Sequence, residues 1–354
     1  MMKSLLAPIL LTMSLNSNFI APNFDSVVYY VNSNNVEMTE VNYNKLIQLG
    51  YVAREIELLS QEEYDEMSSL HIKQTVAYSY VEKSTYNVTN NNISLISKNI
   101  ISKEEAIKEI TLSKNATINT RSTTNATSQV QDEYKQITLT GSITGLSQDE
   151  MKYFVKATNI WLTPPVFRGF DYISLNMGDN VQICMQTING LQRPFFSSSF
   201  IYTRTERYVQ DNGIFDPIES ITTTEVIEEI ANTDTDDYKY GIGEGISVGY
   251  KLPTDAIENN SSVGNYSEFS ITHTNLLMSI SGYFEPQIDN LIRTTFGSGY
   301  AHSTLDLVPQ WASVTLTNSA PYIVVEAGLG LSQTYEIYGT NIILDSSDIV
   351  WPNC

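Results

Sequence analysis

Few side chains in this sequence could carry out metal or acid–base chemistry. The 354 residues include three histidines, His71, His273 and His302. A catalytic zinc ion needs three protein ligands and an open position, and these histidines do not form a motif such as H-E-x-x-H. His273 lies within an alternating, strand-like stretch, which favours a structural role. We therefore predict no metal site and no catalytic residue at the histidines.

Ser298 and His302 have the residue types of a nucleophile and its base. The serine lies in Gly297-Ser298-Gly299-Tyr300. This run lacks the G-x-S-x-G spacing and the strand-to-helix turn of a nucleophile elbow. Glycines within a strand pattern more often mark a bend or a close backbone approach. The favoured interpretation is a Gly-rich bend between strands.

Carboxylates are numerous, with 40 Asp and Glu residues. Two carboxylates about 5 to 9 Å apart can hydrolyse glycosidic bonds, but the sequence does not single out such a pair. The densest acidic stretch, residues 233–238, lacks the glycine and the final glutamate of an EF-hand loop. It predicts a solvated loop, with a loose surface calcium site as the alternative. No P-loop or dinucleotide fingerprint occurs, so we expect no cofactor.

The two cysteines, Cys184 and Cys354, do not form a disulfide framework. In an oxidising compartment they could pair and tie the C-terminus to the β region. The alternative is that Cys184 is a small buried residue in its apolar strand. Aromatic faces can bind sugars or proteins, but Trp161 lies in an apolar run that favours a place in the core.

Composition narrows the classes of protein further. The formal net charge is −20, and only 17% of residues are charged. Because nucleic acids are bound through Lys and Arg, this charge excludes a nucleic-acid partner. The 22 tyrosines and the many Ser and Thr residues favour pleated, half-buried surfaces. An acidic, β-rich protein follows.

The N-terminus has the pattern of a secretory signal peptide. Lys3 precedes an apolar run over residues 4–15, which matches the length of a signal-peptide core. A membrane-spanning helix needs about 20 apolar residues, so we predict a signal peptide over residues 1–21 and no transmembrane segment. The alternative is a buried N-terminal helix, against which Pro8 argues. Export places the mature protein outside the cell or at the cell surface.

Residues 22–70 predict a small helical unit. Thr39 can cap a first helix that ends before Gly50, which has the position of a C-terminal glycine. A second helix is expected over residues 52–58. Ser60 and Glu63 form a capping box that opens a third helix. Three short helices bury little surface alone, so this unit must pack against another part of the chain.

The same unit carries a family resemblance. Its residues are Tyr43-Asn44-Lys45-Leu46-Ile47-Gln48-Leu49-Gly50-Tyr51, Glu55-Ile56 and Leu59-Ser60-Gln61-Glu62-Glu63-Tyr64. This pattern resembles one near the start of uncharacterised exported proteins of low-GC Gram-positive bacteria. The likeness continues loosely through the β region, for example at Gly299-Tyr300-Ala301-His302. It implies export and a β domain, and it implies no particular activity or functional residue.

The rest of the chain divides in two. Residues 71–135 predict a polar linker region with a short helix over residues 103–110, capped by Ser102. Residues 136–354 predict many strands separated by turn signals such as Asn189-Gly190. Many strands with few helices favour an antiparallel β-sandwich. The fold class is therefore mainly β, with a small N-terminal helical unit.

Three functions remain open. The favoured interpretation is a secreted or cell-surface-associated binding protein whose ligand is a glycan or a protein. The second is a β-pore-forming toxin of the aerolysin-like kind, suggested by Ser/Thr-rich strands. Its nearest hairpin candidates, residues 220–230 and 322–338, lack a sustained alternation. The third is an extracellular polymer hydrolase. The sequence names no ligand-binding residue.

Overall fold

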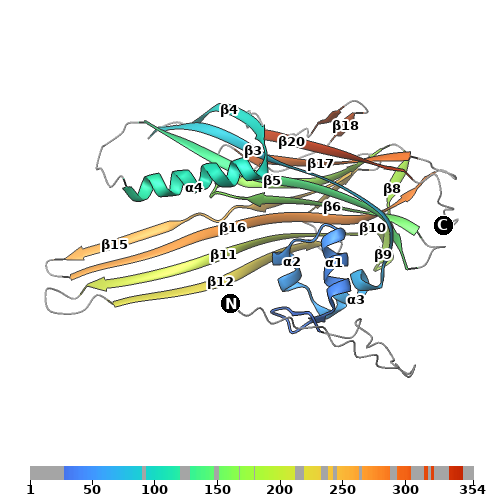
Figure 1. The fold of residues 1–354 in the computed structure, drawn as a ribbon, viewed down its shortest axis with the longest axis horizontal. Helices are drawn as coiled ribbons and strands as arrows, with labels where there is room; N and C mark the ends of the chain where they lie inside the picture. The colour runs from blue at the N-terminus through green and yellow to red at the C-terminus, as the bar shows by residue number, and fades with distance from the viewer. Residues whose placement is uncertain are drawn as a thin grey trace, which may run out of the picture.

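The computed structural model describes fourteen stretches of the chain. They are residues 28–89, 93–119, 128–146, 151–166, 168–178, 180–211, 219–232, 238–241, 245–262, 265–287, 293–303, 315–317, 320–322 and 335–345. The predicted signal peptide, the acidic stretch at residues 233–237 and the strand expected over residues 323–329 lie outside them. Figure 1 shows an elongated molecule in which long strands run along the major axis.

The N-terminal unit has the three predicted helices. They are α1 (Glu40–Gln48), α2 (Ala53–Leu58) and α3 (Gln61–Ser69), preceded by a hairpin of β1 (Tyr30–Val31) and β2 (Glu37–Met38). The Asn42 amide donates to Thr39 Oγ1 at 3.2 Å, and Ser60 and Glu63 form the expected capping box. Gly50 has φ +96°, and a Cβ there would lie 2.9 Å from Thr140 on β5. The helix caps are confirmed.

The helical unit packs on the outer face of a large sheet, as its small size requires. Leu46, Leu49 and Ile56 are fully buried in a cluster that also contains Phe154 of β6. Tyr283 of β16 packs against the same cluster. The sheet thus supplies part of the core that three short helices cannot build alone.

The large sheet is antiparallel and, within the described residues, has nine strands. Its main path runs β12–β11–β16–β6–β5–β3–β4, and β15 and β8 also pair with β16. The strands are β3 (His71–Thr89), β4 (Ile93–Ile101), β5 (Ser128–Gly145), β6 (Met151–Trp161), β8 (Val181–Ile183), β11 (Phe196–Asp211), β12 (Glu219–Asn232), β15 (Ala256–Ser262) and β16 (Asn265–Pro286).

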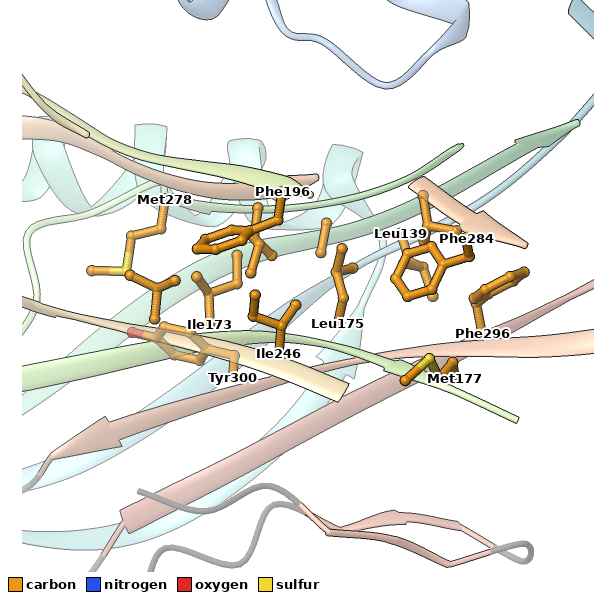
Figure 2. Close-up of a cluster of buried hydrophobic side chains, with 14 of the residues drawn as sticks. Leu139, Ile173, Leu175, Met177, Phe196, Ile246, Met278, Phe284, Phe296 and Tyr300 are labelled. Atoms are coloured by element: carbon orange, nitrogen blue, oxygen red, sulfur yellow. The ribbon is translucent and has the colours of Figure 1, made fainter. Parts of the chain in front are cut away.

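A second antiparallel sheet covers part of the first. Its order is β13–β14–β7–β17–β20, and its strands are β13 (Tyr238–Gly241), β14 (Gly245–Lys251), β7 (Phe170–Met177), β17 (Arg293–Ser303) and β20 (Tyr335–Asp345). Figure 2 shows side chains of both sheets facing one another, such as Leu139 and Phe284 above Leu175 and Phe296. This shared core makes the protein an antiparallel β-sandwich, which confirms the predicted fold class.

Some expected elements differ in detail. Within the region where the sequence predicts many strands, residues 181–188 form two short ones, β8 and β9 (Met185–Ile188), with Cys184 between them; β9 pairs with β10 (Leu191–Pro194). Asn189 and Gly190 both have positive φ and form the predicted hairpin turn. The Gly-rich bend expected at residues 297–299 is instead part of the continuous strand β17. Small residues there let Ser174 of β7 bond to the Gly299 backbone.

Residues 71–135 also differ from the expected polar linker. They supply β3, β4 and the start of β5 to the large sheet, together with the helix α4 (Lys103–Asn119). Ser102 Oγ accepts the Glu105 amide at 3.1 Å, as its predicted cap. The inner face of β3 carries Glu82 and Ser84, both buried. These polar side chains hide the apolar alternation that marks the other strands.

Candidate functional site

The large sheet extends beyond the small one as a single layer, which we call the arm. The arm comprises residues 203–211 of β11, 219–226 of β12, 256–262 of β15 and 265–274 of β16, seen at the left of Figure 1. Residues 220–226 are exposed on both faces of the strand, and His273 is the one buried side chain among those described in the arm. The arm therefore has no core of its own.

One face of the arm, which we call the hydroxyl face, is built from aligned threonines. Thr205 lies opposite Thr224 on β12 and Thr272 on β16. Directly opposed residues point to the same side of a sheet, so these side chains form a row across three strands. The Thr205 and Thr224 hydroxyl oxygens are 3.3 Å apart. The register places further hydroxyl side chains on this face, Thr203, Ser220, Thr222, Ser270 and Thr274, together with Arg207, Val209, Val226 and Glu268.

The opposite face of the arm is charged. Arg204 Nη1 lies 2.9 Å from Glu225 Oε1 across β11 and β12, and Arg204 also pairs with Glu206. His273 Nδ1 lies 3.2 Å from Asp255 Oδ1 at the root of this face. Charged residues on a lipid-facing strand surface cost about 2–4 kcal/mol each near the bilayer centre. The arm is therefore poorly suited to enter a membrane with its present faces.

An acidic pocket lies where the helical unit meets the root of the arm. Its polar lining includes Glu55, Glu63, Lys156 and Glu228, and serines of β11 and β16 form its floor. Lys156 Nζ is 2.7 Å from Glu55 Oε1, with both side chains buried, and lies 4.3 Å from the centre of the Tyr51 ring. The pocket thus contains one buried ion pair and two further carboxylates.

Glu228 is the most perturbed carboxyl group of this pocket. It lies on the edge strand β12 and stays exposed on its solvent side. Partial burial by the pocket walls and then the charges of Glu63 and Glu55 together raise its pKa to about 7, against the opposing effect of Lys156. The group therefore titrates near neutral pH.

A second unusual feature is the long connection between the paired strands β3 and β5. These strands pair along their whole length, from His71 with Gly145 to Thr89 with Ser128. The chain between them forms β4, which pairs back onto β3, and then α4. Figure 1 shows α4 lying alongside these strands. We call β4 and α4 together the excursion.

The first part of α4 is anchored to the sheet. Ala106 and Ile110 are buried against Val81 and Tyr134. Glu109 Oε2 lies 2.7 Å from Lys83 Nζ and accepts the Tyr134 hydroxyl at 2.6 Å. Hydrogen bonds from Lys83 and then Tyr134 lower the pKa of Glu109. The carboxylate is thus held in its charged form at the centre of the anchor.

The second part of α4 has a sequence typical of a strand. Residues 110–119 read Ile-Thr-Leu-Ser-Lys-Asn-Ala-Thr-Ile-Asn, in which positions alternate between an apolar set, apart from Lys114, and a hydroxyl or amide set. Thr, Ser, Asn and Ile are each roughly 0.5 kcal/mol less favourable in a helix than Ala. Thr111, Leu112 and Ser113 are exposed. The packing of Ile110 and the contacts of the neighbouring Glu109, and not intrinsic propensity, therefore hold the start of this stretch helical.

Strand β4 shows the same alternation once its bulge is counted. The register with β3 shifts between Thr85 and Tyr86, which leaves Ile96 as the extra residue. The pairing then places Leu95, Lys98 and Ile100 on one side of the strand, and Ser97, Asn99 and Ile101 on the other. Leu95, Ile96 and Ile100 are exposed large apolar residues.

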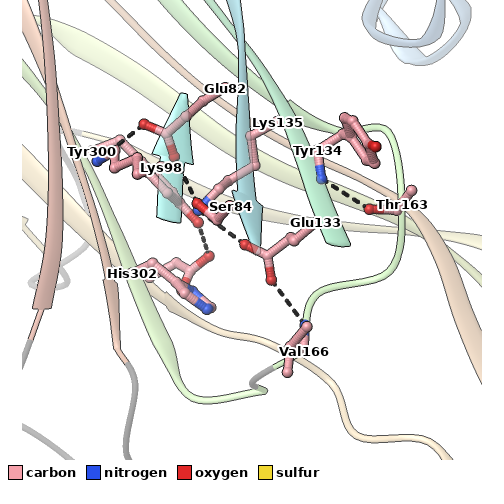
Figure 3. A network of polar contacts seen from close by, with 11 residues as sticks. Glu82, Ser84, Lys98, Glu133, Tyr134, Lys135, Thr163, Val166, Tyr300 and His302 are labelled. Atoms are coloured by element: carbon pink, nitrogen blue, oxygen red, sulfur yellow. Dashed lines mark hydrogen bonds and ion pairs between the residues drawn. The ribbon is translucent and has the colours of Figure 1, made fainter. Parts of the chain in front are cut away.

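The core of the sandwich contains a buried polar network near the arm (Figure 3). Lys135 Nζ is 3.1 Å from Glu133 Oε1, and Lys135 lies over the rings of Trp161 and Tyr300. His302 Nδ1 is 2.6 Å from Asp171 Oδ1, and both residues are fully buried. Burying charges costs free energy that only good geometry offsets, and the Lys135 ammonium over the Tyr300 ring is a polar contact between the two sheets.

The structure separates Ser298 and His302, which have the residue types of a nucleophile and its base but were expected in a Gly-rich bend. Ser298 and His302 lie four residues apart on the same strand β17, so their Cα atoms are about 13 Å apart. Ser298 and His302 are both buried in the core. The pair is therefore structural, and sequence reasoning missed the true partner of His302, Asp171, which lies on the neighbouring strand.

The remaining residues singled out in the sequence have mixed outcomes. Trp161 is a core residue, as predicted. Cys184 is buried, and Cys354 lies outside the described residues, so their pairing stays a prediction. Trp311 and Trp351 also lie outside. His71 begins β3, and residues 220–230 form most of β12. Of residues 322–338, the structure describes only the ends.

Two searches for recognisable features of known proteins are negative. No protein-family model matches the chain, and no curated protein matches it either.

Among the described residues, no group of three His, Cys, Asp or Glu side chains could hold a metal ion. In the same part of the chain, no helix has the length and apolar character needed to cross a membrane.

Proposed function

We propose that this protein is exported and acts on the membranes of other cells by inserting β-strands, as a pore-forming protein does. The observation that carries this proposal is the length of the strands. β3, β5, β11 and β16 have 19, 18, 16 and 22 residues, whereas strands of globular proteins usually have about 5–6. The sandwich core needs only part of this length.

The excess length supports a function outside the sandwich. A strand of about 9–11 residues crosses a bilayer, so each long strand could serve as the base on which a membrane-crossing hairpin is built. Backbone groups inside a bilayer must all be bonded, which requires a closed barrel of strands from several copies. The hydroxyl-rich, weakly charged strand surfaces are compatible with the inside of such a barrel.

Dye release from vesicles tests this proposal. The mature chain is added to uncharged phosphatidylcholine–cholesterol vesicles, because its charge of −20 opposes binding to anionic lipid. We expect release of carboxyfluorescein together with oligomers that resist detergent. The control is the passage of polyethylene glycols of increasing size, because a pore of fixed width excludes only the larger polymers, whereas general membrane damage lets all sizes through. Vesicles that retain their dye under conditions where the protein binds to cells would refute the proposal.

The hydroxyl face favours a second candidate, a binding protein that leaves the membrane intact. Aligned hydroxyl side chains offer a flat set of donors and acceptors, with Arg207 among them, which suits a glycan surface. On this candidate the triple substitution Thr205→Val, Thr224→Val and Thr272→Val should weaken retention on cells or glycan arrays at least about tenfold. Thr223→Val, on the opposite face, is the matched control. Equal binding by both variants would reject the hydroxyl face as the binding surface.

The hydrolase alternative stays a prediction from the number of carboxylates. In the described part of the chain the acidic pocket gathers Glu55, Glu63 and Glu228. Glu55 is engaged by Lys156 in a buried pair, which favours a structural role for that carboxylate. Turnover of a defined polymer that is lost in Glu228→Gln would support the hydrolase instead.

A further inference from the structure

We propose that the excursion, β4 and α4, is the segment that crosses the membrane, and that α4 unwinds into a strand when it does so. The inference rests on the proposed function and names the residues and the partner, the hydrocarbon layer of a lipid bilayer. The candidate residues are 93–101 and 110–119. Each stretch has the length of one crossing strand.

The position of the excursion makes this change possible without unfolding the sandwich. β3 and β5 are already paired up to Thr89 and Ser128, the two residues from which the excursion departs. Release of β4 from β3 and unwinding of α4 would let both stretches continue this antiparallel pair outward. β4 is the end strand of the main sheet path, so its departure leaves the pairing of β3 with β5 unchanged.

The side chains of the excursion match a membrane hairpin better than those of the arm. In an extended chain, Ile110, Leu112, Ala116 and Ile118 would share one face and Thr and Asn residues the other. Such alternation gives a lipid face and a water face. Lys98 and Lys114 interrupt the apolar sides, and a lysine stem can carry its ammonium group to the interface. The arm instead has Arg204, Glu206 and Glu225 on its non-hydroxyl face.

Apart from Lys98 and Lys114, the charged residues of the excursion lie between its two candidate strands. Lys103, Glu104 and Glu105 begin α4, and Lys108 and Glu109 follow one turn later. In a hairpin this group forms the polar tip that remains in water on the far side of the bilayer. In the soluble protein Glu109 instead bonds to Lys83 and Tyr134. The same residues would therefore anchor α4 in the soluble form and form the polar tip in the membrane form.

A reversible tether tests the inference. The chain's own two cysteines are replaced by serine, and the substitutions Lys83→Cys and Glu109→Cys are introduced. A bifunctional thiosulfonate reagent then joins the two new thiols. We expect dye release to fall at least about tenfold and to return when the reagent is cleaved by dithiothreitol. The matched control joins Arg168→Cys and Asp255→Cys at the root of the arm, where the Arg168 Nη2 to Asp255 Oδ2 distance is 3.0 Å. This second tether should change release by less than twofold.

The outcomes separate the two proposals. Release that is equally fast with the α4 tether in place overturns the membrane role of α4 while the pore proposal stands. Loss of release with the control tether alone assigns the crossing segment to the arm and likewise overturns the inference. Absence of release from the untethered wild-type chain refutes the pore proposal itself, and with it the inference that depends on it.

A fluorescence scan of single labelled positions provides a second, independent measurement. Thr111, Leu112 and Ser113 are exposed in the soluble protein, so single cysteines there should not disturb folding. A polarity-sensitive dye at position 112 should brighten severalfold on vesicles and be quenched by nitroxide lipids, whereas dyes at 111 and 113 should change little. Similar responses at all three positions would show that the segment lies on the membrane without forming a strand, and would overturn the inference.

Discussion

Lys156 on β6 and Glu55 on α2 form a buried ion pair of 2.7 Å that joins the helical unit to the large sheet. Removing one partner of such a pair leaves an uncompensated charge and costs about 3–5 kcal/mol. We predict that Lys156→Met lowers the urea midpoint and speeds amide exchange in α1–α3. The double variant Lys156→Met with Glu55→Leu should recover much of the loss. A double variant as unstable as the single one would mean that the pair itself, and not the orphaned charge, dominates.

The acidic pocket predicts a pH dependence near neutrality. Glu228 has its pKa raised from about 4.5 in the unfolded chain to about 7 in the fold, first by burial and then by Glu63 and Glu55. The folded state therefore binds this proton more tightly, so stability falls as pH rises from about 5 through 7. Glu228→Gln should flatten this part of the Tm–pH curve. Glu225→Gln, on the same strand, is the control and should leave the slope unchanged.

The anchor of α4 predicts the opposite pH sign. Hydrogen bonds from Lys83 and Tyr134 lower the pKa of Glu109, so their contribution is present above the ordinary glutamate pKa and is lost as pH falls through the lowered value. Glu109→Gln at pH 7 should raise the rate of thermolysin cleavage in α4 several-fold, which corresponds to about 1 kcal/mol. Glu104→Gln in the same helix should have no effect. Equal cleavage rates in both variants would contradict the assigned anchor.

At Gly245 we predict that the single methyl group of an alanine side chain destabilises the fold. Its φ is +135°, and a Cβ there would lie 2.2 Å from the Leu175 carbonyl oxygen of β7. Gly190 also has positive φ, +78°, but its Cβ would meet nothing within 4 Å. Gly190→Ala should therefore cost about 1 kcal/mol for backbone strain alone, and Gly245→Ala should cost clearly more. Thermal unfolding of the two variants measures the difference.

Local patterns in the sequence predicted local structure well. Thr39, Gly50 and Ser60 marked the ends of helices because each signal needs only neighbouring residues. Strands such as β6 and β7 were visible because one or both faces are apolar. The strand β3 was missed because its inner face carries Glu82 and Ser84, which bond to one another, while Glu82 also pairs with Lys98 of the neighbouring strand β4.

The candidate functional features depend on pairing that the sequence does not display. Thr205, Thr224 and Thr272 are separated by as many as 67 residues, and only the register aligns them. The alternation of β4 becomes visible only when Ile96 is recognised as a bulge. In α4 the sequence did carry a signal, because a stretch of alternating Thr and apolar residues follows the predicted helix, but tertiary anchoring through Ile110 and Glu109 holds it helical.

The position of β16 within the large sheet has a consequence for how the chain folds. β16 lies between β11 and β6. Residues 151–160 of β6 therefore gain their second neighbouring strand only after residues 277–284 of β16 have been synthesised. Contacts so distant in sequence make folding slow. The half-sheet made earlier would meanwhile show an unsatisfied edge, which is a hazard for aggregation. A chain of this topology gains from being kept unfolded until its last third has been delivered, and refolding from denaturant should give its highest yield at high dilution.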